Sequence, residues 1–344
     1  MKKIGILTGG ADCPGLNSVI RAVVRKAMQD GYVVTGIKNG WSGLIDNDMR
    51  ILDLRSTTGI LDRGGTILGT SRINPCKDPE LIKKIRENYK RSGIDALIAV
   101  GGEETLKTAL TLYQEGIIKV VGVPKSIDNA LSGTDYAFGF DTAVNIATEC
   151  IDRLHTTAES HHRIMVVEVM GLYTGWIALE AGIAGGADMI LIPEIPVHMK
   201  DVCDSIKIRH KRGKTFSIIV VSEGVSIDGY LESRKKGYVD DFGYGRRFGA
   251  VGEYVAETIE EATGYETRVS VLGHIQRGGS PSAYDRIIAT RFGVKAVERV
   301  TESKFGKMVS LHDNKLHYVD IEEAVKKRKT VDMELYEMAK VFFV

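Results

Sequence analysis

Short runs of β-branched and aliphatic residues recur along the chain, and most of them end at a glycine or a proline. Between two such runs, Val19, Val23 and Ala27 recur at the spacing of one helical face. Strands that alternate with helices pair in parallel, and the helices then cover both faces of the sheet. We therefore predict an α/β fold with strands at residues 4–7, 96–100, 120–123, 165–169, 189–192, 217–221 and 269–272.

The size and charge of the chain narrow the possible functions. It has 344 residues, of which 43% are apolar, enough for two lobes with cores of their own. Its net charge of +1 predicts no overall attraction to nucleic acid or to a membrane surface. The four cysteines lack metal-ligand spacing. The first residues lead directly into a predicted strand and do not have the pattern of a signal peptide, and no apolar run is long enough to cross a membrane. We expect a cytoplasmic protein.

A glycine-rich loop follows the first predicted strand. Gly9 and Gly10 let the backbone approach an anion closely, and a helix that begins after the loop offers free N–H groups. The pattern matches neither of the common nucleotide-binding motifs, and glycines at such a turn often serve only the turn. Taken alone, this loop supports a phosphate site only weakly.

Two further polar loops follow the predicted strands 96–100 and 120–123. The first contains Glu103 and Glu104, and the second contains Lys125, Ser126 and Asp128. Ligands of parallel sheets bind beyond the carboxyl ends of the strands. A carboxylate suits Mg²⁺, a lysine suits phosphate, and an aspartate can accept a hydroxyl proton. Helix capping or a turn explains each loop by itself, but the three loops together indicate phosphoryl transfer.

Six segments of the chain resemble one known family, and the resemblance extends over nearly the whole length. The segments are residues 9–17 (GGADCPGLN), 64–72 (GGTILGTSR), 101–104 (GGEE), 124–129 (PKSIDN), 170–171 (MG) and 272–281 (LGHIQRGGSP). They are similar to segments of the bacterial-type 6-phosphofructokinases, and the last one is long and highly specific. The resemblance implies two Rossmann-like lobes, each a three-layer αβα sandwich with a mostly parallel sheet, and an active site in the cleft between them.

The same resemblance implies a division of labour between the lobes. Residues 1–139 with about 276–326 would bind the phosphoryl donor, and residues 140–275 with about 327–344 would bind the sugar phosphate. The implied reaction is Mg²⁺-assisted transfer of a phosphoryl group to the 1-hydroxyl of fructose 6-phosphate, a step of glycolysis.

Roles for single residues also follow from the resemblance. Asp128 is expected to take the proton from the sugar hydroxyl, and Arg72 to stabilise charge on the transferring phosphoryl group, as an arginine finger does. Lys125 and Ser126 are expected to assist catalysis, and Glu103 to hold Mg²⁺. The expected donor-binding residues are Gly10, Ala11, Arg72, Gly102, Glu104 and Lys125.

The sugar phosphate is expected to contact a second group of residues. They are Ser126, Arg163, Met170, Gly171, Glu223, Arg268, His274 and Arg277. Arg163 and Arg268 match arginines that reach the sugar phosphate from a neighbouring subunit, which implies a homodimer or homotetramer with shared active sites. Arg21 and Arg25 match effector-binding positions of regulated members, although a solvated helix face is the simpler interpretation.

Two positions bear on the choice of donor. Members that use ATP have glycine at the position of Glu104, whereas members that use pyrophosphate have aspartate there and lysine at the position of Lys125. An anionic side chain obstructs ATP, and a lysine can clamp the donor phosphate. We therefore expect pyrophosphate as the donor, with ATP as the alternative.

The chain departs from the family pattern at three positions. Ala130 replaces a carboxylate near the metal, Leu172 replaces an arginine associated with catalysis, and Ala11 stands where many members have glycine. Loss of one charge-stabilising group typically costs about 3–4 kcal/mol of transition-state stabilisation, and alanine at a positive φ costs about 1 kcal/mol. Three functions stay open: a slow phosphofructokinase, a paralogue acting on another sugar phosphate or polyol, and a sugar-phosphate-binding regulatory protein. Residues 226–249 are expected to form a surface insertion.

Overall fold

The computed structural model describes residues 2–230 and 249–343, and the chain divides into two compact units. The first unit comprises Met1–Thr142 and Arg277–Arg328, and the second comprises Ala143–Gln276 and Lys329–Val344. The chain therefore passes from one unit to the other after Thr142, after Gln276 and after Arg328. Most of the predicted insertion at 226–249 lies outside the described residues.

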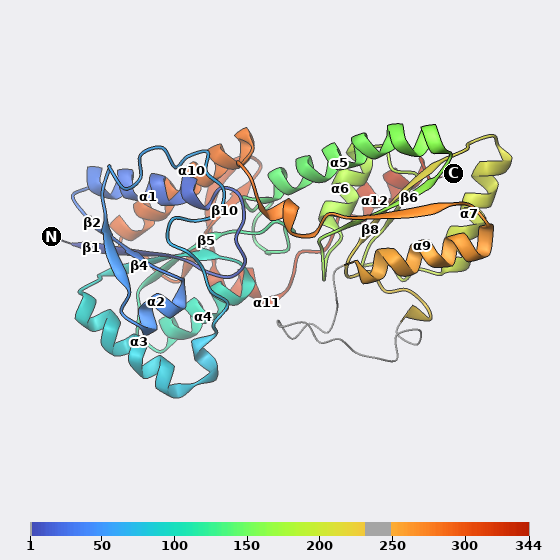
Figure 1. The fold of residues 1–344 in the computed structure, drawn as a ribbon. Coiled ribbons are helices and arrows are strands. Elements are labelled where there is room, and N and C mark those ends of the chain that lie inside the picture. Colours follow the sequence, from blue (N-terminus) through green and yellow to red (C-terminus); the bar gives the residue numbers. More distant parts are fainter. Residues whose placement is uncertain (1, 231–248, 344) are drawn as a thin grey trace. The chain divides into compact units, whose positions relative to one another are not determined.

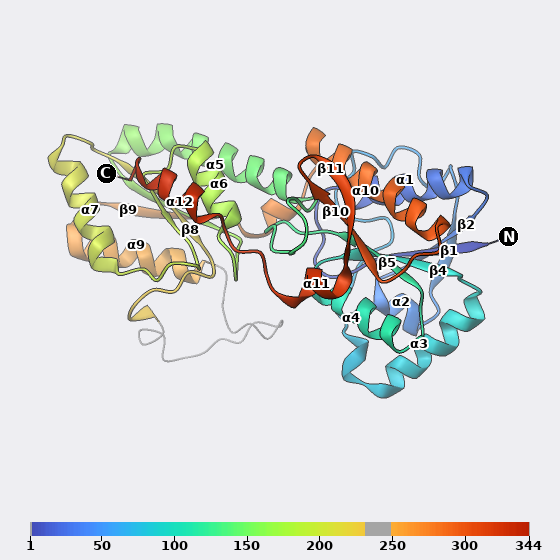
Figure 2. The ribbon, with the colours of Figure 1, turned by 180° about the vertical axis from the view of Figure 1, so that it is seen from behind.

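The first unit is built on a seven-stranded sheet within the described ranges. Its strands are β1 (Lys3–Thr8), β2 (Val33–Ile37), β3 (Met49–Leu52), β4 (Ala96–Gly101), β5 (Val120–Pro124), β10 (Lys307–His312) and β11 (Lys315–Asp320). Their order is β11-β10-β5-β4-β1-β2-β3, and Figure 2 shows β10 and β11 beside β5. The inner strands are parallel, while β3 and β11 run antiparallel to their neighbours at the two edges.

Helices cover both faces of this sheet (Figure 1). They are α1 (Leu16–Gln29), α2 (Trp41–Ile45), α3 (Pro79–Ser92), α4 (Glu103–Gln114), α10 (Ala283–Thr301) and α11 (Ile321–Lys326), with the short 3₁₀ helix η1 (Pro75–Lys77). Ile4 and Ile6 of β1 pack with Val19 of α1 on one face, and Leu7 packs with Leu106 of α4 on the other. This alternation follows from the period of two in a strand.

The second unit has a four-stranded parallel sheet among its described residues. Its strands are β6 (Ile164–Val169), β7 (Met189–Leu191), β8 (Ser217–Ser222) and β9 (Thr267–Val271). Their order is β7-β8-β6-β9. The helices are α6 (Trp176–Ala184), α7 (Met199–Lys211), α9 (Ala250–Thr263) and α12 (Met333–Lys340), with the 3₁₀ helix η2 (Gly273–Arg277). Helix α5 (Phe140–His161) begins in the first unit and continues in the second.

Both faces of the second sheet are also covered. Val166 of β6 shares a core with Ile206 of α7 and Ile259 of α9. On the opposite face, Ile190 of β7 packs against α6, and its carbonyl accepts a hydrogen bond from the Tyr336 hydroxyl of α12 at 3.2 Å. Each unit therefore has the three layers that a parallel sheet requires.

The predicted α/β fold with mostly parallel sheets is confirmed. Each predicted strand corresponds to an observed one, although β9 begins at Thr267 and β7 ends at Leu191. Strands β2, β3, β10 and β11 are not predicted from the sequence, because their apolar runs are short or interrupted by polar residues. In the described ranges, every helix is too short or too polar to cross a bilayer.

Candidate functional site

The glycine-rich loop between β1 and α1 is shaped by a close contact with Thr105 of α4. A Cβ atom at Gly9 would lie 2.7 Å from Thr105 Oγ1, and one at Gly101 would lie 2.4 Å from Thr105 Cβ. Gly10 has a φ of +78°, in the left-handed region that favours glycine. The first and second predicted loops therefore meet at the side chain of Thr105.

A second backbone segment holds the glycine loop in place. The N–H group of Gly10 donates to the carbonyl of Ser71 at 3.0 Å, and the Thr70 hydroxyl donates to the carbonyl of Gly10 at 2.6 Å. Arg72, the residue predicted to stabilise the transferring phosphoryl group, follows directly in sequence. The structure thus brings the segment of Arg72 to the loop that carries the predicted donor-binding residues Gly10 and Ala11.

Alanine at position 11 carries no conformational cost. Ala11 is not among the non-glycine residues with positive φ, so the expected penalty of about 1 kcal/mol does not arise. The requirement for glycine falls on Gly10 instead. The carbonyl of Ala11 accepts a hydrogen bond from the ammonium group of Lys125.

Lys125 lies just after β5, and only 5% of the residue is exposed. A Cβ atom placed on Gly10 would lie 3.5 Å from Lys125 Nζ. Burial lowers the pKa of Lys125 because the ammonium group loses hydration, and the carboxylates of Asp12 and Asp128 oppose this shift. A buried cation therefore lies against the glycine loop and brings the first and third predicted loops together.

The predicted base, Asp128, accepts a hydrogen bond from the hydroxyl of Ser126. The next residue, Asn129, has a φ of 49°, and its side chain binds the backbone N–H of Ala137 at 3.1 Å and the carbonyl of Asp135 at 3.2 Å. Sequence reasoning did not assign Asn129 this role. The signal was present, because asparagine adopts the left-handed conformation more readily than most residues.

The carboxylate of Glu103, in the first turn of α4, is held by two cations. It accepts hydrogen bonds from Lys107 Nζ at 2.6 Å and from Arg328 Nε at 2.7 Å. Glu104 is more exposed, at 65% of its side chain, and lies 3.7 Å from the same lysine. Lys107 could have been found from the i, i+4 spacing on a helix. Arg328 is 225 positions from Glu103 and has no comparable signal.

Glu103 is the acidic residue that the sequence predicts as a metal ligand. In the part of the chain that the structure describes, no group of three or more His, Cys, Asp or Glu side chains is arranged to hold a metal. A single carboxylate still fits Mg²⁺, which takes many of its ligands from water and substrate phosphates. Glu103 offers such a carboxylate beside the glycine loop. Because a cation already binds each of its oxygens, a metal ion would compete for at least one of them.

Three residues predicted to bind the sugar phosphate meet in the second unit. Met170 and Gly171 follow β6, and Glu223 follows the adjacent strand β8. The N–H group of Gly171 donates to Glu223 Oε1 at 3.1 Å. Gly171 has a φ of +142°, and a Cβ atom there would lie 2.4 Å from Ser222 Oγ. These residues therefore lie together at the carboxyl ends of neighbouring parallel strands.

The two predicted phosphate-binding arginines meet at Glu266, which sequence reasoning did not identify. Arg163 Nη2 lies 2.8 Å and Arg268 Nη2 lies 2.5 Å from a Glu266 oxygen. The parallel register pairs Ile164 with Thr267, so that Arg163 and Glu266 precede the paired residues on adjacent strands. Hydrogen bonding by Arg163, together with the charges of both arginines, lowers the pKa of Glu266.

His274 and Arg277 lie in η2, where the chain leaves the second unit. His274 belongs to the second unit, whereas Arg277 is the first residue of the returning part of the first unit. The positive charge of Arg277 adds to the lowering of the pKa of Lys125. Arg277 thus contributes to the charge around the donor-side loops, and its contact with the sugar phosphate stays a prediction.

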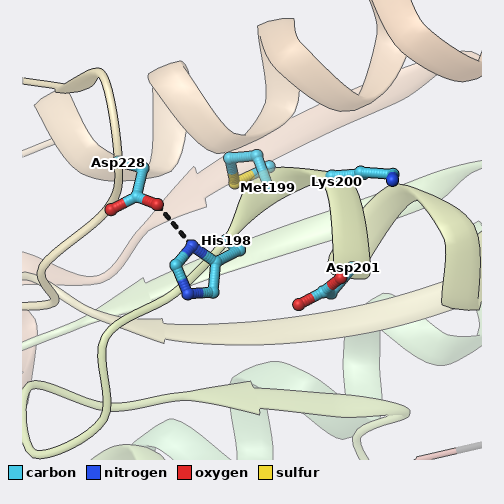
Figure 3. Close-up of a pocket in the computed structure, with 5 residues that line it drawn as sticks. All are labelled: His198, Met199, Lys200, Asp201 and Asp228. Carbon is cyan, nitrogen blue, oxygen red and sulfur yellow. Dashed lines mark hydrogen bonds and ion pairs between the residues drawn. The ribbon is translucent and has the colours of Figure 1, made fainter.

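The second unit also has a cavity of about 500 Å³ at the start of α7, shown in Figure 3. Its lining residues are His198, Met199, Lys200, Asp201 and Asp228. The imidazole of His198 is hydrogen-bonded to the carboxylate of Asp228. None of the sequence-predicted site residues lines this cavity, so it is not part of the site described above.

Comparison with known sequences gives full-length matches. The family model described as Phosphofructokinase matches residues 3–300. A pyrophosphate–fructose 6-phosphate 1-phosphotransferase of Streptomyces coelicolor is 53% identical over 343 residues and covers 99% of both chains. The protein of the same name from Amycolatopsis methanolica is 53% identical over 342 residues, with 99% of both chains covered. An ATP-dependent 6-phosphofructokinase of Corynebacterium efficiens is 47% identical over 344 residues, again with 99% of both covered.

Solved structures agree with these matches. A pyrophosphate-dependent phosphofructokinase of Nitrosospira multiformis has a TM-score of 0.84 at 21% identity, over 96% of this chain and 86% of that one, which shows the shared fold. A phosphofructokinase of Saccharomyces cerevisiae is 33% identical with a TM-score of 0.80. The alignment covers 95% of this chain and 45% of the yeast chain. Because the family model matches most of the chain and several relatives cover 99% of it, this protein belongs to the phosphofructokinase family.

Proposed function

We propose that this protein transfers a phosphoryl group from pyrophosphate to the 1-hydroxyl of fructose 6-phosphate with Mg²⁺, as a cytoplasmic enzyme of glycolysis. The observation that carries the proposal is the buried ammonium group of Lys125 against the glycine loop. A cation there, close to the start of α1, suits a small polyanionic donor. The names of the S. coelicolor and A. methanolica relatives support the same reaction.

Asp128 is the proposed general base. The sugar oxygen forms a bond to phosphorus as Asp128 takes its proton, and the bridging bond of pyrophosphate breaks to release phosphate. The hydroxyl of Ser126 donates to the Asp128 carboxylate and so restricts its orientation. Arg72, which follows the segment bound to Gly10, would stabilise negative charge on the transferring group.

Glu103 is the proposed protein ligand of Mg²⁺. When bound, the ion would neutralise negative charge on the donor phosphates. The contribution of the chain is to keep the Glu103 carboxylate in the first turn of α4, two residues before Thr105. The contacts of Thr105 with Gly9 and Gly101 then keep this turn beside the glycine loop.

The second unit is the proposed binding unit for the sugar phosphate. Met170, Gly171 and Glu223 offer polar backbone and carboxylate groups at adjacent strand ends, where sugar hydroxyls can be bound. Arg163 and Arg268 are proposed to bind the phosphate of a sugar held by a neighbouring subunit in a homodimer or homotetramer. In the structure both arginines bind Glu266, so the phosphate would take the place of that carboxylate.

Glu104 is the residue that favours pyrophosphate over ATP. Its side chain is largely exposed in the first turn of α4, where it would obstruct the bulky ATP nucleotide, whereas the smaller pyrophosphate needs less room. ATP is the second candidate donor, because the C. efficiens relative is named as an ATP-dependent enzyme. The ratio of kcat/KM for the two donors decides between them.

The proposal is tested by incubating the purified protein with fructose 6-phosphate, Mg²⁺ and either donor, and measuring fructose 1,6-bisphosphate. We expect product with pyrophosphate and little or none with ATP. Efficient turnover with ATP would refute the donor assignment. A panel of phosphorylated sugars and polyols tests the acceptor, because Ala130 and Leu172 depart from the family pattern. Calorimetric binding of the sugar phosphate without product from either donor would support a regulatory protein instead.

A further inference from the structure

Arg328 and Glu103 form an ion pair whose members are 225 positions apart. Arg328 Nε lies 2.7 Å from Glu103 Oε2, while Lys107 Nζ lies 2.6 Å from Oε1. The side chain of Glu103 is 23% exposed and that of Arg328 is 38% exposed. Both oxygens of the carboxylate are therefore bound by cations that belong to the protein itself.

The backbone brings Arg328 to this place independently of its charge. Arg328 pairs with Leu131 in an antiparallel β-bridge, and Leu131 follows the loop that carries Asp128 and Ala130. The guanidinium therefore extends from a backbone that is already anchored beside the loop that carries Asp128, called the catalytic loop below. An ion pair with this support loses less chain entropy than one between two mobile surface side chains.

We propose that in the unliganded protein Arg328 binds the Glu103 carboxylate at the place that the divalent cation takes when it binds. The guanidinium and the metal ion then compete for this carboxylate. The proposal rests on the role of Glu103 as metal ligand under the proposed function. A guanidinium and a divalent cation both bind carboxylate oxygens, and they repel each other at short range. Binding of the guanidinium and the divalent cation to one carboxylate at the same time is therefore unfavourable.

A competition of this kind favours the binding of a polyanionic donor. Without a cation, Glu103 and Glu104 would present two adjacent carboxylates and would repel pyrophosphate. Arg328 and Lys107 compensate this charge before the metal ion arrives. Once the metal ion replaces Arg328 at Glu103, the guanidinium lies beside the catalytic loop, where a phosphate group is a suitable new partner.

The test uses Mn²⁺ as a spectroscopic probe of the divalent-cation site, with free Mn²⁺ measured by electron paramagnetic resonance in the absence of donor and sugar. Arg328→Gln removes the competing charge. Lys327→Gln is the matched control, because it removes the same charge from an exposed neighbour that makes no ion pair among the described residues. At constant ionic strength we expect Mn²⁺ to bind about 3–10-fold more tightly to Arg328→Gln, and within about twofold of wild type to Lys327→Gln.

Two outcomes of this comparison would overturn the competition. One is Mn²⁺ binding by a folded Arg328→Gln that is equal to or weaker than that of wild type. The other is an equal gain in Lys327→Gln, which would reduce the effect to general surface charge. Glu103→Gln tests the proposed function separately. If it binds Mn²⁺ like wild type, the metal-ligand assignment fails; if it loses Mn²⁺ while Arg328→Gln gains nothing, only the competition is wrong.

A second measurement needs no variant of Arg328 for its main result. In wild-type protein labelled at arginine, the Nε–H resonance of Arg328 is followed by nuclear magnetic resonance during titration with Mg²⁺, and Arg328→Lys identifies the signal. We expect the resonance to move toward that of a solvent-exposed arginine as Mg²⁺ binds. A resonance that stays unchanged while Mg²⁺ saturates the protein would overturn the proposal.

Discussion

Two carboxylates, Glu103 in the first unit and Glu266 in the second, each form a cluster with two cationic side chains. The clusters differ in which member, the carboxylate or the cations, is expected to bind the ligand. Glu103 is a predicted functional residue held by Lys107 and Arg328, neither of which was predicted. Glu266 was not predicted, and it holds the two arginines expected to bind phosphate. At Glu103 a ligand would replace a cation, and at Glu266 a ligand would replace the carboxylate. At these two sites the unliganded protein thus pairs each charge with an opposite charge of its own.

Exposure separates the two clusters further. The side chain of Glu103 is 23% exposed, whereas that of Glu266 is 40% exposed and therefore better screened by water. Exposed ion pairs contribute only about 0.2–1 kcal/mol each. A divalent cation or a phosphate monoester can therefore displace either partner at a low cost, and the less exposed carboxylate, Glu103, should hold its partners more strongly.

Asp128 lies outside both clusters, and its replacement is expected to have the largest effect. Asp128→Asn removes the proton acceptor with little change of shape. We expect kcat to fall by about 10²–10⁴-fold, the usual contribution of a general base, while KM for fructose 6-phosphate stays within a few-fold. Steady-state kinetics with saturating donor measure both values. An unchanged kcat would show that Asp128 is not the base.

The same substitution at the two carboxylates sharpens the comparison directly. Glu103→Gln is expected to lower kcat by about 10²-fold, because charge on the donor is no longer compensated through a metal ligand. Glu266→Gln is expected to lower KM for fructose 6-phosphate by about two- to fivefold, because the arginines no longer have to leave a carboxylate. Both effects are read from initial rates at varied substrate. Losses of similar size in both variants would break the comparison.

Replacement of Arg163 tests the arginine side of the cluster at Glu266. Arg163→Ala is expected to raise KM for fructose 6-phosphate by about 10–100-fold, since a hydrogen bond to a charged group contributes about 1.5–3 kcal/mol. Arg153→Ala is the matched control, because Arg153 is an exposed arginine that pairs with Glu149 on α5. A similar KM in the two variants would separate Arg163 from sugar-phosphate binding.

The smallest expected effect is one on stability: apart from its proposed role in donor binding, Lys125 tests a cation that binds a carbonyl rather than a carboxylate. Burial lowers its pKa in the folded protein below the ordinary value of 10.5. The unfolded chain then binds more protons between the two pKa values, so the cost of the buried charge is full below the folded-state pKa and vanishes as pH rises through 10.5. Lys125→Met should raise Tm by a few degrees at pH 7, as measured by calorimetry. A gain that is constant up to pH 10.5 would contradict this account.

Most of the strands that were predicted are buried on both faces, although β9 is not, and the buried strands β2 and β10 were missed because polar residues or glycine interrupt their apolar runs. All six residues of β4 and of β8 are buried, so the strands read as continuous apolar runs. The edge strands β3 and β11 are largely exposed and carry polar residues, which hides them from such a pattern. The same limit explains why the antiparallel edges were not expected in a sheet read as parallel.

The residues of the site also fall into those that could be predicted from the sequence and those that could not. Lys125 and Asp128 lie on loops that directly follow buried strands, and that position could be read from the sequence. Lys107 was within reach of the i, i+4 rule, and Glu266 lies two residues before Arg268, directly ahead of strand β9. Arg328 could not have been found, because only the folding of a distant segment against Leu131 brings it to Glu103.

The sheet of the first unit is assembled from two distant stretches of chain, and this has a consequence for synthesis on the ribosome. Strand β5 pairs with β10, where Val121 lies opposite Lys307. All four strands of the second sheet are translated between these two. A nascent chain can therefore complete the second sheet while β5 still presents an open edge, the kind of surface that promotes aggregation. Protection of that edge by chaperones should matter most until β10, which begins only at Lys307 of the 344 residues, emerges.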